Sequence, residues 1–152
     1  MDGMTKCFET HSPEETRALG RKLGEKAASG ELFCLNGDLG AGKTVFVKGF
    51  AEGLGISEDV VSPTFTILQI YESGRLPLYH FDVYRIGDPE EMDEIGYEDY
   101  FFGEGVTVVE WSDLIRELRP EDAVRILIEK TDGGDDERRI TVTEYRHEDS
   151  RN

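Results

Sequence analysis

Hydrophobic positions in the first third of the chain alternate between helical and strand-like spacing. Residues 12–15, Ser-Pro-Glu-Glu, place an N-cap serine before a proline and a glutamate at the third helical position, which is the capping-box pattern of a helix start. Apolar residues at helical intervals follow until Gly30, and residues 31–36 form a short apolar run of strand length. After a glycine-rich stretch, Phe46, Phe50 and Leu54 recur every four residues and predict a second helix.

The rest of the chain carries more strand pattern than helix pattern. Two β-rich runs, 64–72 and 76–84, flank Ser73-Gly74 and predict a hairpin, and residues 124–129 and 138–144 predict a closing hairpin. Between these hairpins lie a second helix start at residues 88–91, a near-continuous apolar strand at 106–110 and a helical segment at 112–118. We therefore expect an α/β fold with a mixed, mainly parallel central sheet and added β-hairpins.

Length and charge narrow the choice of function. A chain of 152 residues predicts one domain over 1–152, with a core at about 8–145 and a polar tail at 147–152. Its 17 basic and 33 acidic residues give a net charge of −16, which disfavours direct binding to DNA, to other nucleic acids or to an anionic membrane. No transmembrane run or signal peptide is visible, and Cys7 and Cys34 lie far apart without a metal-binding pattern, so we expect a cytoplasmic protein with reduced thiols.

The glycine-rich stretch matches the P-loop pattern G-x-x-x-x-G-K-[ST] between a predicted strand and a predicted helix. Glycines allow the backbone to turn successive N–H groups toward phosphate oxygens. The lysine can bridge the β- and γ-phosphates, and the threonine can offer its hydroxyl to Mg²⁺. The pattern predicts a single-domain P-loop NTPase fold, with the nucleotide held by Asp38, Leu39, Gly40, Ala41, Gly42, Lys43 and Thr44.

Two predicted strands end in acidic residues, Asp82 and Glu110. Either residue alone is more often a strand-end group that faces solvent, but carboxyl ends of strands beside a P-loop project into the crevice that holds phosphates. One carboxylate can then hold Mg²⁺ while the other orients the attacking water. Because Glu110 ends the more apolar strand, we assign it to the ion and Asp82 to hydrolysis. Residues 62–64, Ser-Pro-Thr, could form a γ-phosphate-sensing loop, although an ordinary turn fits their spacing better.

The acidic excess concentrates in residues 82–104, which hold nine acids and one base. A solvated surface is the simpler interpretation. The same stretch also contains Tyr97, Tyr100 and Phe101, and an acidic surface with aromatic anchors suits docking to a basic protein partner.

Four motifs, in their order and spacing, resemble those of one family. The chain has G-D-L-G-A-G-K-T at 37–44, S-P-T-F-T at 62–66, H-F-D-V-Y-R at 80–85 and V-E-W at 109–111. The P-loop alone is generic, whereas the other three motifs together resemble TsaE, the bacterial ATPase family of tRNA threonylcarbamoyladenosine biosynthesis. The resemblance covers about residues 8–145.

The resemblance implies a Mg²⁺-dependent ATPase that binds ATP and ADP. It also implies action with the TsaB–TsaD heterodimer, so that tRNA is reached only through protein. Lys43 and Asp82 would then be catalytic, and Thr44 and Glu110 would hold Mg²⁺. The family's N-terminal segment and a late strand help to hold the base, which suggests Ser12 and Arg138 here.

Three other functions fit parts of the pattern. A small-molecule P-loop kinase would have a similar length and loop, but it needs a substrate pocket with clustered arginines, for which Arg116 and Arg119 are the only comparable pair in the middle of the chain. A GTPase would carry an N-K-x-D guanine-reading segment, and none is present. A non-enzymatic binding module would not require both the lysine and the threonine of the P-loop.

Overall fold

The computed structural model describes residues 2–38, 40–61, 63 and 67–146. Leu39, Ser62, Thr64 and the predicted tail at 147–152 lie outside the described residues. The elements in chain order are β1 Asp2–Thr10, α1 Pro13–Lys26, β2 Leu32–Gly37, α2 Lys43–Gly53, β3 Leu68–Tyr71, β4 Leu78–Asp82, α3 Glu91–Ile95, α4 Tyr97–Phe101, β5 Val106–Glu110, the 3₁₀ helix η1 Ser112–Leu118, β6 Val124–Lys130 and β7 Arg138–Arg146.

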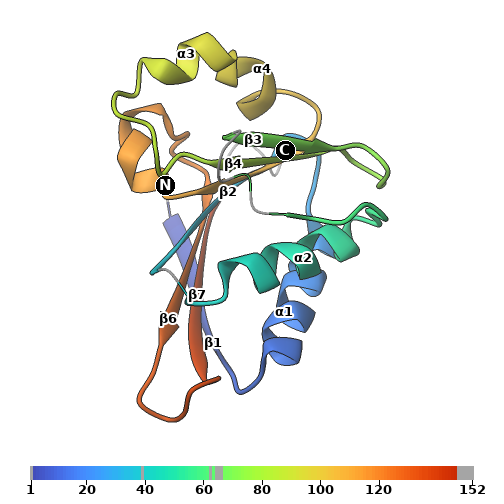
Figure 1. Cartoon of the computed structure of the whole chain (residues 1–152), viewed down its shortest axis with the longest axis vertical. Helices are drawn as coiled ribbons and strands as arrows, with labels where there is room; N and C mark the ends of the chain where they lie inside the picture. Colours follow the sequence, from blue (N-terminus) through green and yellow to red (C-terminus); the bar gives the residue numbers. More distant parts are fainter. Residues whose placement is uncertain (1, 39, 62, 64–66, 147–152) are drawn as a thin grey trace.

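The seven strands of the described chain form one sheet in the order β1-β7-β6-β2-β5-β4-β3 (Figure 1). Its four central strands, β6, β2, β5 and β4, run parallel. Antiparallel partners extend it at both edges, where β3 pairs with β4 and β7 pairs with β6 and β1. The predicted α/β fold, with its mixed sheet, parallel centre and added hairpins, is confirmed.

Helices cover the sheet on two sides: α1 and α2 lie on one face, and α3 and α4 lie on the other (Figure 1). Alternate residues of the central strand β2 supply two separate cores. Phe33 and Leu35 join the core on the α1–α2 side, whereas Leu32 and Cys34 join the core on the α3–α4 side. A strand buried on both faces reads as a continuous apolar run, which is why the sequence predicted β2 correctly.

Glycines bring α1 and α2 into close contact. A Cβ atom added at Gly20 of α1 would clash with the backbone of α2 at Phe46, and one added at Gly49 of α2 would clash with the backbone of α1 at Arg17. Since α2 begins at the end of the P-loop, this packing fixes the helix end that faces the predicted nucleotide site.

Parts of the structure differ from what the sequence predicted. Strand β1 was not predicted, because its residues are mostly polar or glycine, Met4 and Cys7 are exposed, and Phe8 is the one apolar side chain of residues 3–10 that packs against a core. The segment 112–118 is helical as predicted, but it is a 3₁₀ helix with a kink at Ile115. Phe101 was expected as an exposed anchor and is wrong in that role, since it is 2% exposed and packs in the α3–α4 core against Phe81 and Tyr97.

Candidate nucleotide-binding site

The P-loop links the end of β2 to the start of α2. Gly40 and Gly42 adopt left-handed backbone angles, with φ of 79° and 105°, which side chains other than glycine rarely tolerate. Gly42 is the N-cap of α2, and Phe46 N–H donates to its carbonyl at 3.0 Å. The free N–H groups of the first helical turn therefore point out of the loop, where an anion is stabilised by them and by the helix dipole.

A cavity of about 400 Å³ lies between the P-loop and the carboxyl ends of β4 and β5. Its lining brings together Lys43 and Thr44 from the P-loop with Asp82 from β4 and Glu110 from β5. Asp82 and Glu110 are direct neighbours in the parallel register of these strands. The structure thus joins four of the residues that the sequence predicted for phosphate, Mg²⁺ and water.

Lys43 is buried inside this site. Its side chain is 6% exposed, its Nζ lies 3.9 Å from Glu110 Oε1, and it lies 3.8 Å from the centre of the Trp111 ring. Nζ has no hydrogen-bond partner in the described part of the chain. Burial lowers the pKa of the Lys43 ammonium, and the nearby carboxylates, Glu110 first, oppose that shift. A buried ammonium with unused donors fits phosphate oxygens.

Glu110 is held by a residue that the sequence analysis did not assign. Its carboxylate is 5% exposed, and Oε2 lies 2.6 Å from Nε2 of the buried His80 on β4. This contact fixes one carboxylate oxygen and leaves Oε1 facing Lys43. The sequence contained a usable signal: His80 lies two residues before Asp82, and therefore on the same face of the strand.

Asp82 lies in a different environment. It is half-buried, and its Oδ1 accepts the Tyr84 N–H at 3.0 Å. Burial, with help from the charge of Glu110, raises the pKa of the Asp82 carboxyl, while the Tyr84 N–H, His80 and Lys43 oppose the rise. No group of three or more His, Cys, Asp or Glu gathers as a metal cluster in the described chain. The Glu110 carboxylate and the Thr44 hydroxyl instead fit Mg²⁺ that is also held by substrate phosphates.

Comparisons with known proteins agree with this geometry. Residues 10–140 match the family model described as "Threonylcarbamoyl adenosine biosynthesis protein TsaE". The chain belongs to the TsaE family. Among its relatives is the TsaE protein of Bacillus subtilis (strain 168), with 52% identity over 90% of this chain and 84% of that protein. The TsaE protein of Treponema pallidum (strain Nichols) is 43% identical over 88% of this chain and 96% of its own.

A solved structure of a relative has the same fold. The crystal structure of YdiB from Bacillus subtilis aligns with a TM-score of 0.82 and 45% sequence identity, covering 95% of this chain and 88% of that one. The resemblance to TsaE that four motifs suggested is thereby confirmed. In the described residues, no helix is both long and apolar enough to cross a membrane.

The two residues that the TsaE resemblance suggested for the base have different surroundings. Arg138, at the start of β7, donates from Nε to the Ala41 carbonyl at 2.8 Å and so braces the P-loop. Ser12 caps α1, where its Oγ accepts the Glu15 N–H at 3.1 Å. Neither residue lines the cavity that contains Lys43, and their role in holding the base stays a prediction.

Trp111 forms a wall of the same cavity. Its backbone is left-handed, with φ of 62°, which is uncommon for a residue with a side chain. Its ring lies 4.8 Å from the ring of Tyr84, a side chain that is 54% exposed. The turn after β5 therefore directs an aromatic surface toward Lys43 and leaves the neighbouring Tyr84 open to solvent.

Proposed function

We propose that this TsaE-family chain is a Mg²⁺-dependent ATPase that supports threonylcarbamoyl transfer to tRNA through protein partners. The observation that carries the proposal is the buried Lys43 ammonium, which has unused hydrogen-bond donors and faces Asp82 and Glu110 at the end of a P-loop. A structural lysine would be expected to satisfy its donors or to extend into solvent.

The residues divide the work of hydrolysis. The P-loop N–H groups and Lys43 bind the phosphates, and Thr44 and Glu110 hold Mg²⁺, which would neutralise charge that develops on the phosphate oxygens. His80 keeps the Glu110 carboxylate in one orientation through its 2.6 Å contact. Asp82, with its raised pKa, orients the attacking water and is suited to accept its proton.

The base is proposed to be adenine. The chain has no N-K-x-D segment for guanine, and Arg138 and Ser12 are the candidate contacts for the base. Competition between ATP and GTP for one labelled nucleotide tests this preference. Equal or tighter binding of GTP would contradict it.

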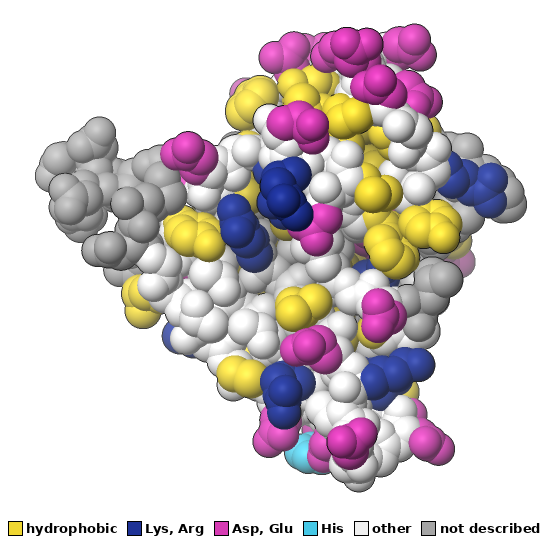
Figure 2. Space-filling view, turned by 90° about the vertical axis from the view of Figure 1, so that its left-hand side faces the viewer, with side chains coloured by type: hydrophobic (Ala, Val, Ile, Leu, Met, Phe, Trp, Pro, Cys, Tyr) yellow, Lys and Arg dark blue, Asp and Glu magenta, His cyan; other side chains and the backbone are white. Residues whose placement is uncertain are grey.

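The proposed partner is the TsaB–TsaD heterodimer, with tRNA reached only through it. A net charge of −16 repels a phosphate backbone, whereas it favours a basic protein surface. Residues 88–104, here named the acidic cap, carry eight acids and no base over α3 and α4, at the top of Figure 2. Because Phe101 is buried, the neighbouring Phe102, which is 65% exposed, is the better aromatic anchor of this surface.

The test is ATP hydrolysis measured alone and with the purified heterodimer. We expect Mg²⁺-dependent release of inorganic phosphate without any added acceptor, and faster release with the heterodimer. A small-molecule kinase would instead need an acceptor to turn over. Loss of partner binding on Phe102→Ala, with unchanged ATP affinity, would support docking on the acidic cap.

A further inference from the structure

A second, larger cavity of about 800 Å³ lies on the face of β6 and β7 opposite to α1 and α2. Alternate residues of β6 show the two sides: Ile126 and Ile128 are buried in the α1–α2 core, whereas Arg125 and Leu127 are exposed. Leu127 is 40% exposed, and Thr141 and Thr143 of β7 are half-buried beside it. Figure 2 shows basic side chains on this face, below the acidic cap.

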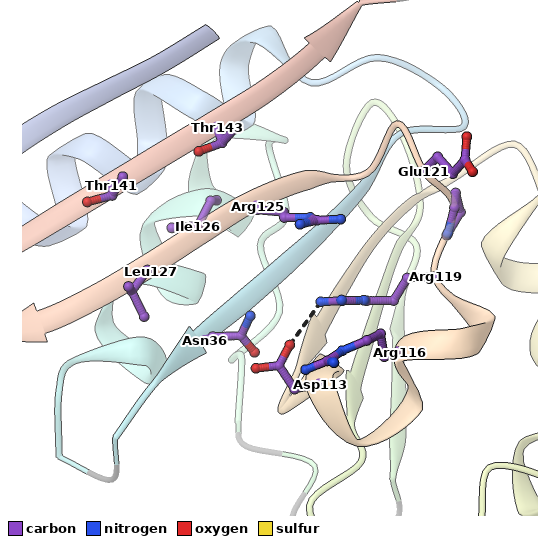
Figure 3. A pocket seen from close by; sticks show the side chains of 11 residues that line it. Asn36, Asp113, Arg116, Arg119, Glu121, Arg125, Ile126, Leu127, Thr141 and Thr143 are labelled. Atoms are coloured by element: carbon purple, nitrogen blue, oxygen red, sulfur yellow. Dashed lines mark hydrogen bonds and ion pairs between the residues drawn. The ribbon is translucent and has the colours of Figure 1, made fainter. Parts of the chain in front are cut away.

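Three arginines line this cavity, and we call it the arginine pocket. Arg116 comes from η1, Arg119 from the segment after it and Arg125 from β6, and Figure 3 shows their side chains directed into one space. The lining also holds two carboxylates, Asp113 and Glu121. Guanidinium groups therefore outnumber carboxylates here, in a chain whose acids outnumber its bases by almost two to one.

The arginines have hydrogen-bond donors that are not paired with acceptors. Arg119 has a side chain that is 9% exposed; its Nη1 donates to Asp113 Oδ1 at 3.0 Å, but its buried Nε has no partner in the described chain. Arg116 and Arg125 form no ion pair with any described residue, and Arg125 lies over the ring of Tyr145 at 5.3 Å. A buried donor without an acceptor lowers the stability of the fold. A bound anion would supply the missing acceptor and remove that loss.

We propose that the arginine pocket binds a carboxylate side chain of the protein partner. The contact of Asp113 with Arg119 shows that a carboxylate fits the pocket. A nucleic acid is disfavoured, because its chain of phosphates would also meet Glu121 in the lining and the exposed Glu129, which lies two residues beyond Leu127 on the same face of β6. A single acidic side chain on a protein meets only the arginines, and the open strand face with Leu127 supplies area for the surrounding contact.

The pocket is connected to the nucleotide site by hydrogen bonds. Arg119 Nη1 lies 3.4 Å from Ser112 Oγ, and both the backbone N–H and the hydroxyl of Ser112 lie within 3.3 Å of Asn36 Oδ1. Asn36 directly precedes Gly37, the first residue of the P-loop. A partner carboxylate that competes with Asp113 for Arg119 would therefore act on the strand end that carries the P-loop.

The inference rests on the proposed function, since its test uses the TsaB–TsaD heterodimer with ATP present. The variant is Arg116→Glu with Arg125→Glu, which leaves the buried Arg119 in place. Its control is Lys22→Glu with Lys26→Glu, which changes the net charge equally on exposed positions of α1. We expect the pocket variant to weaken heterodimer binding about tenfold or more, against less than about threefold for the control.

The outcomes separate the two proposals. If the wild-type chain binds the heterodimer and the pocket variant binds as the control does, the arginine pocket is not a docking site and the proposed function stands. If the wild-type chain does not bind the heterodimer, both proposals fail. Binding of purified tRNA by the wild-type chain that the pocket variant loses, with heterodimer affinity unchanged, would assign the pocket to RNA and overturn this inference. Equal melting temperatures and equal ATP affinity of wild type and variant show that both fold alike.

Discussion

The cavity that brings Lys43 together with Asp82 and Glu110, here named the nucleotide cavity, and the arginine pocket both gather charge near the carboxyl end of β2, but they differ in how these charges are buried and paired. In the nucleotide cavity, Lys43 and Glu110 are each about 95% buried and lie within ion-pair distance of one another. In the arginine pocket, Arg116 and Arg125 are exposed and have no ion-pair partner in the described chain. The first site places its ammonium beside carboxylates inside the protein, whereas the second leaves two guanidinium groups on the surface without an ion pair in the described chain.

The buried charges suit a preorganised reaction site, whereas the exposed charges suit recognition of a partner. Fixed charges in a buried site need no rearrangement when charge develops during a reaction, and they act strongly because water is excluded. Exposed charges are screened and contribute little to stability, but they can steer a partner and set its orientation. Substitutions in the two sites should therefore affect different measurements, with turnover changing in one and association in the other.

The largest effect is expected at Lys43. Lys43→Ala removes the ammonium that we propose to bind the phosphates, so ATP hydrolysis should fall by about 10²-fold or more. Lys48→Ala is the matched control, because Lys48 is exposed on the same helix, and it should leave hydrolysis unchanged. Steady-state release of phosphate measures both. If Lys43→Ala hydrolyses ATP like the wild type, the nucleotide cavity is not the site where substitutions change turnover, and the two sites no longer differ in that respect.

The next effect should distinguish the two carboxylates. Asp82→Asn should retain nucleotide affinity while turnover falls, by about 10-fold to 10²-fold, because the proposed role of Asp82 is to orient water and not to bind the nucleotide in the ground state. Glu110→Gln should instead raise the Mg²⁺ concentration needed for half-maximal nucleotide binding. Mg²⁺ titrations of nucleotide binding, combined with turnover, measure both quantities. The reverse pattern would exchange the two roles.

Sequence alone located the nucleotide cavity because its parts are local or lie at strand ends. The P-loop is contiguous, and Asp82 and Glu110 each follow an apolar run that the parallel sheet brings to one edge. His80 was not assigned, since its contact with Glu110 depends on the pairing of β4 with β5. The fold class was predictable from strand and helix periodicity, whereas the exposed edge strand β1 has no apolar alternation to indicate it.

The arginine pocket could not be predicted in the same way. Arg116 and Arg119 were noticed as a pair, but Arg125 joins them only because β6 returns beside η1 in the folded chain. Phe101 was misplaced for a related reason. In a helix of five residues, such as α4, helical spacing has too few positions to show which aromatic side chain is buried.

The smallest effect expected is on the pH dependence of stability. It tests whether burial of the Asp82 carboxylate in the nucleotide cavity lowers the free energy of unfolding. Burial raises the pKa of Asp82 in the folded state above its value in the unfolded chain. The folded state therefore binds more protons in this range, so the contribution of Asp82 to stability decreases as the pH rises through the interval between the two pKa values. Asp82→Asn should remove this loss, and the variant should be at least as stable as the wild type at neutral pH while having lower turnover. Because Asp82 is only half-buried, the gain should be less than about 1 kcal/mol. Thermal melts from acid to neutral pH measure it, with Asp59→Asn as an exposed control that removes the same charge. If Asp82→Asn and Asp59→Asn shift the melting temperature equally at every pH, the cavity does not impose this cost on Asp82, and water orientation must be explained without a raised pKa.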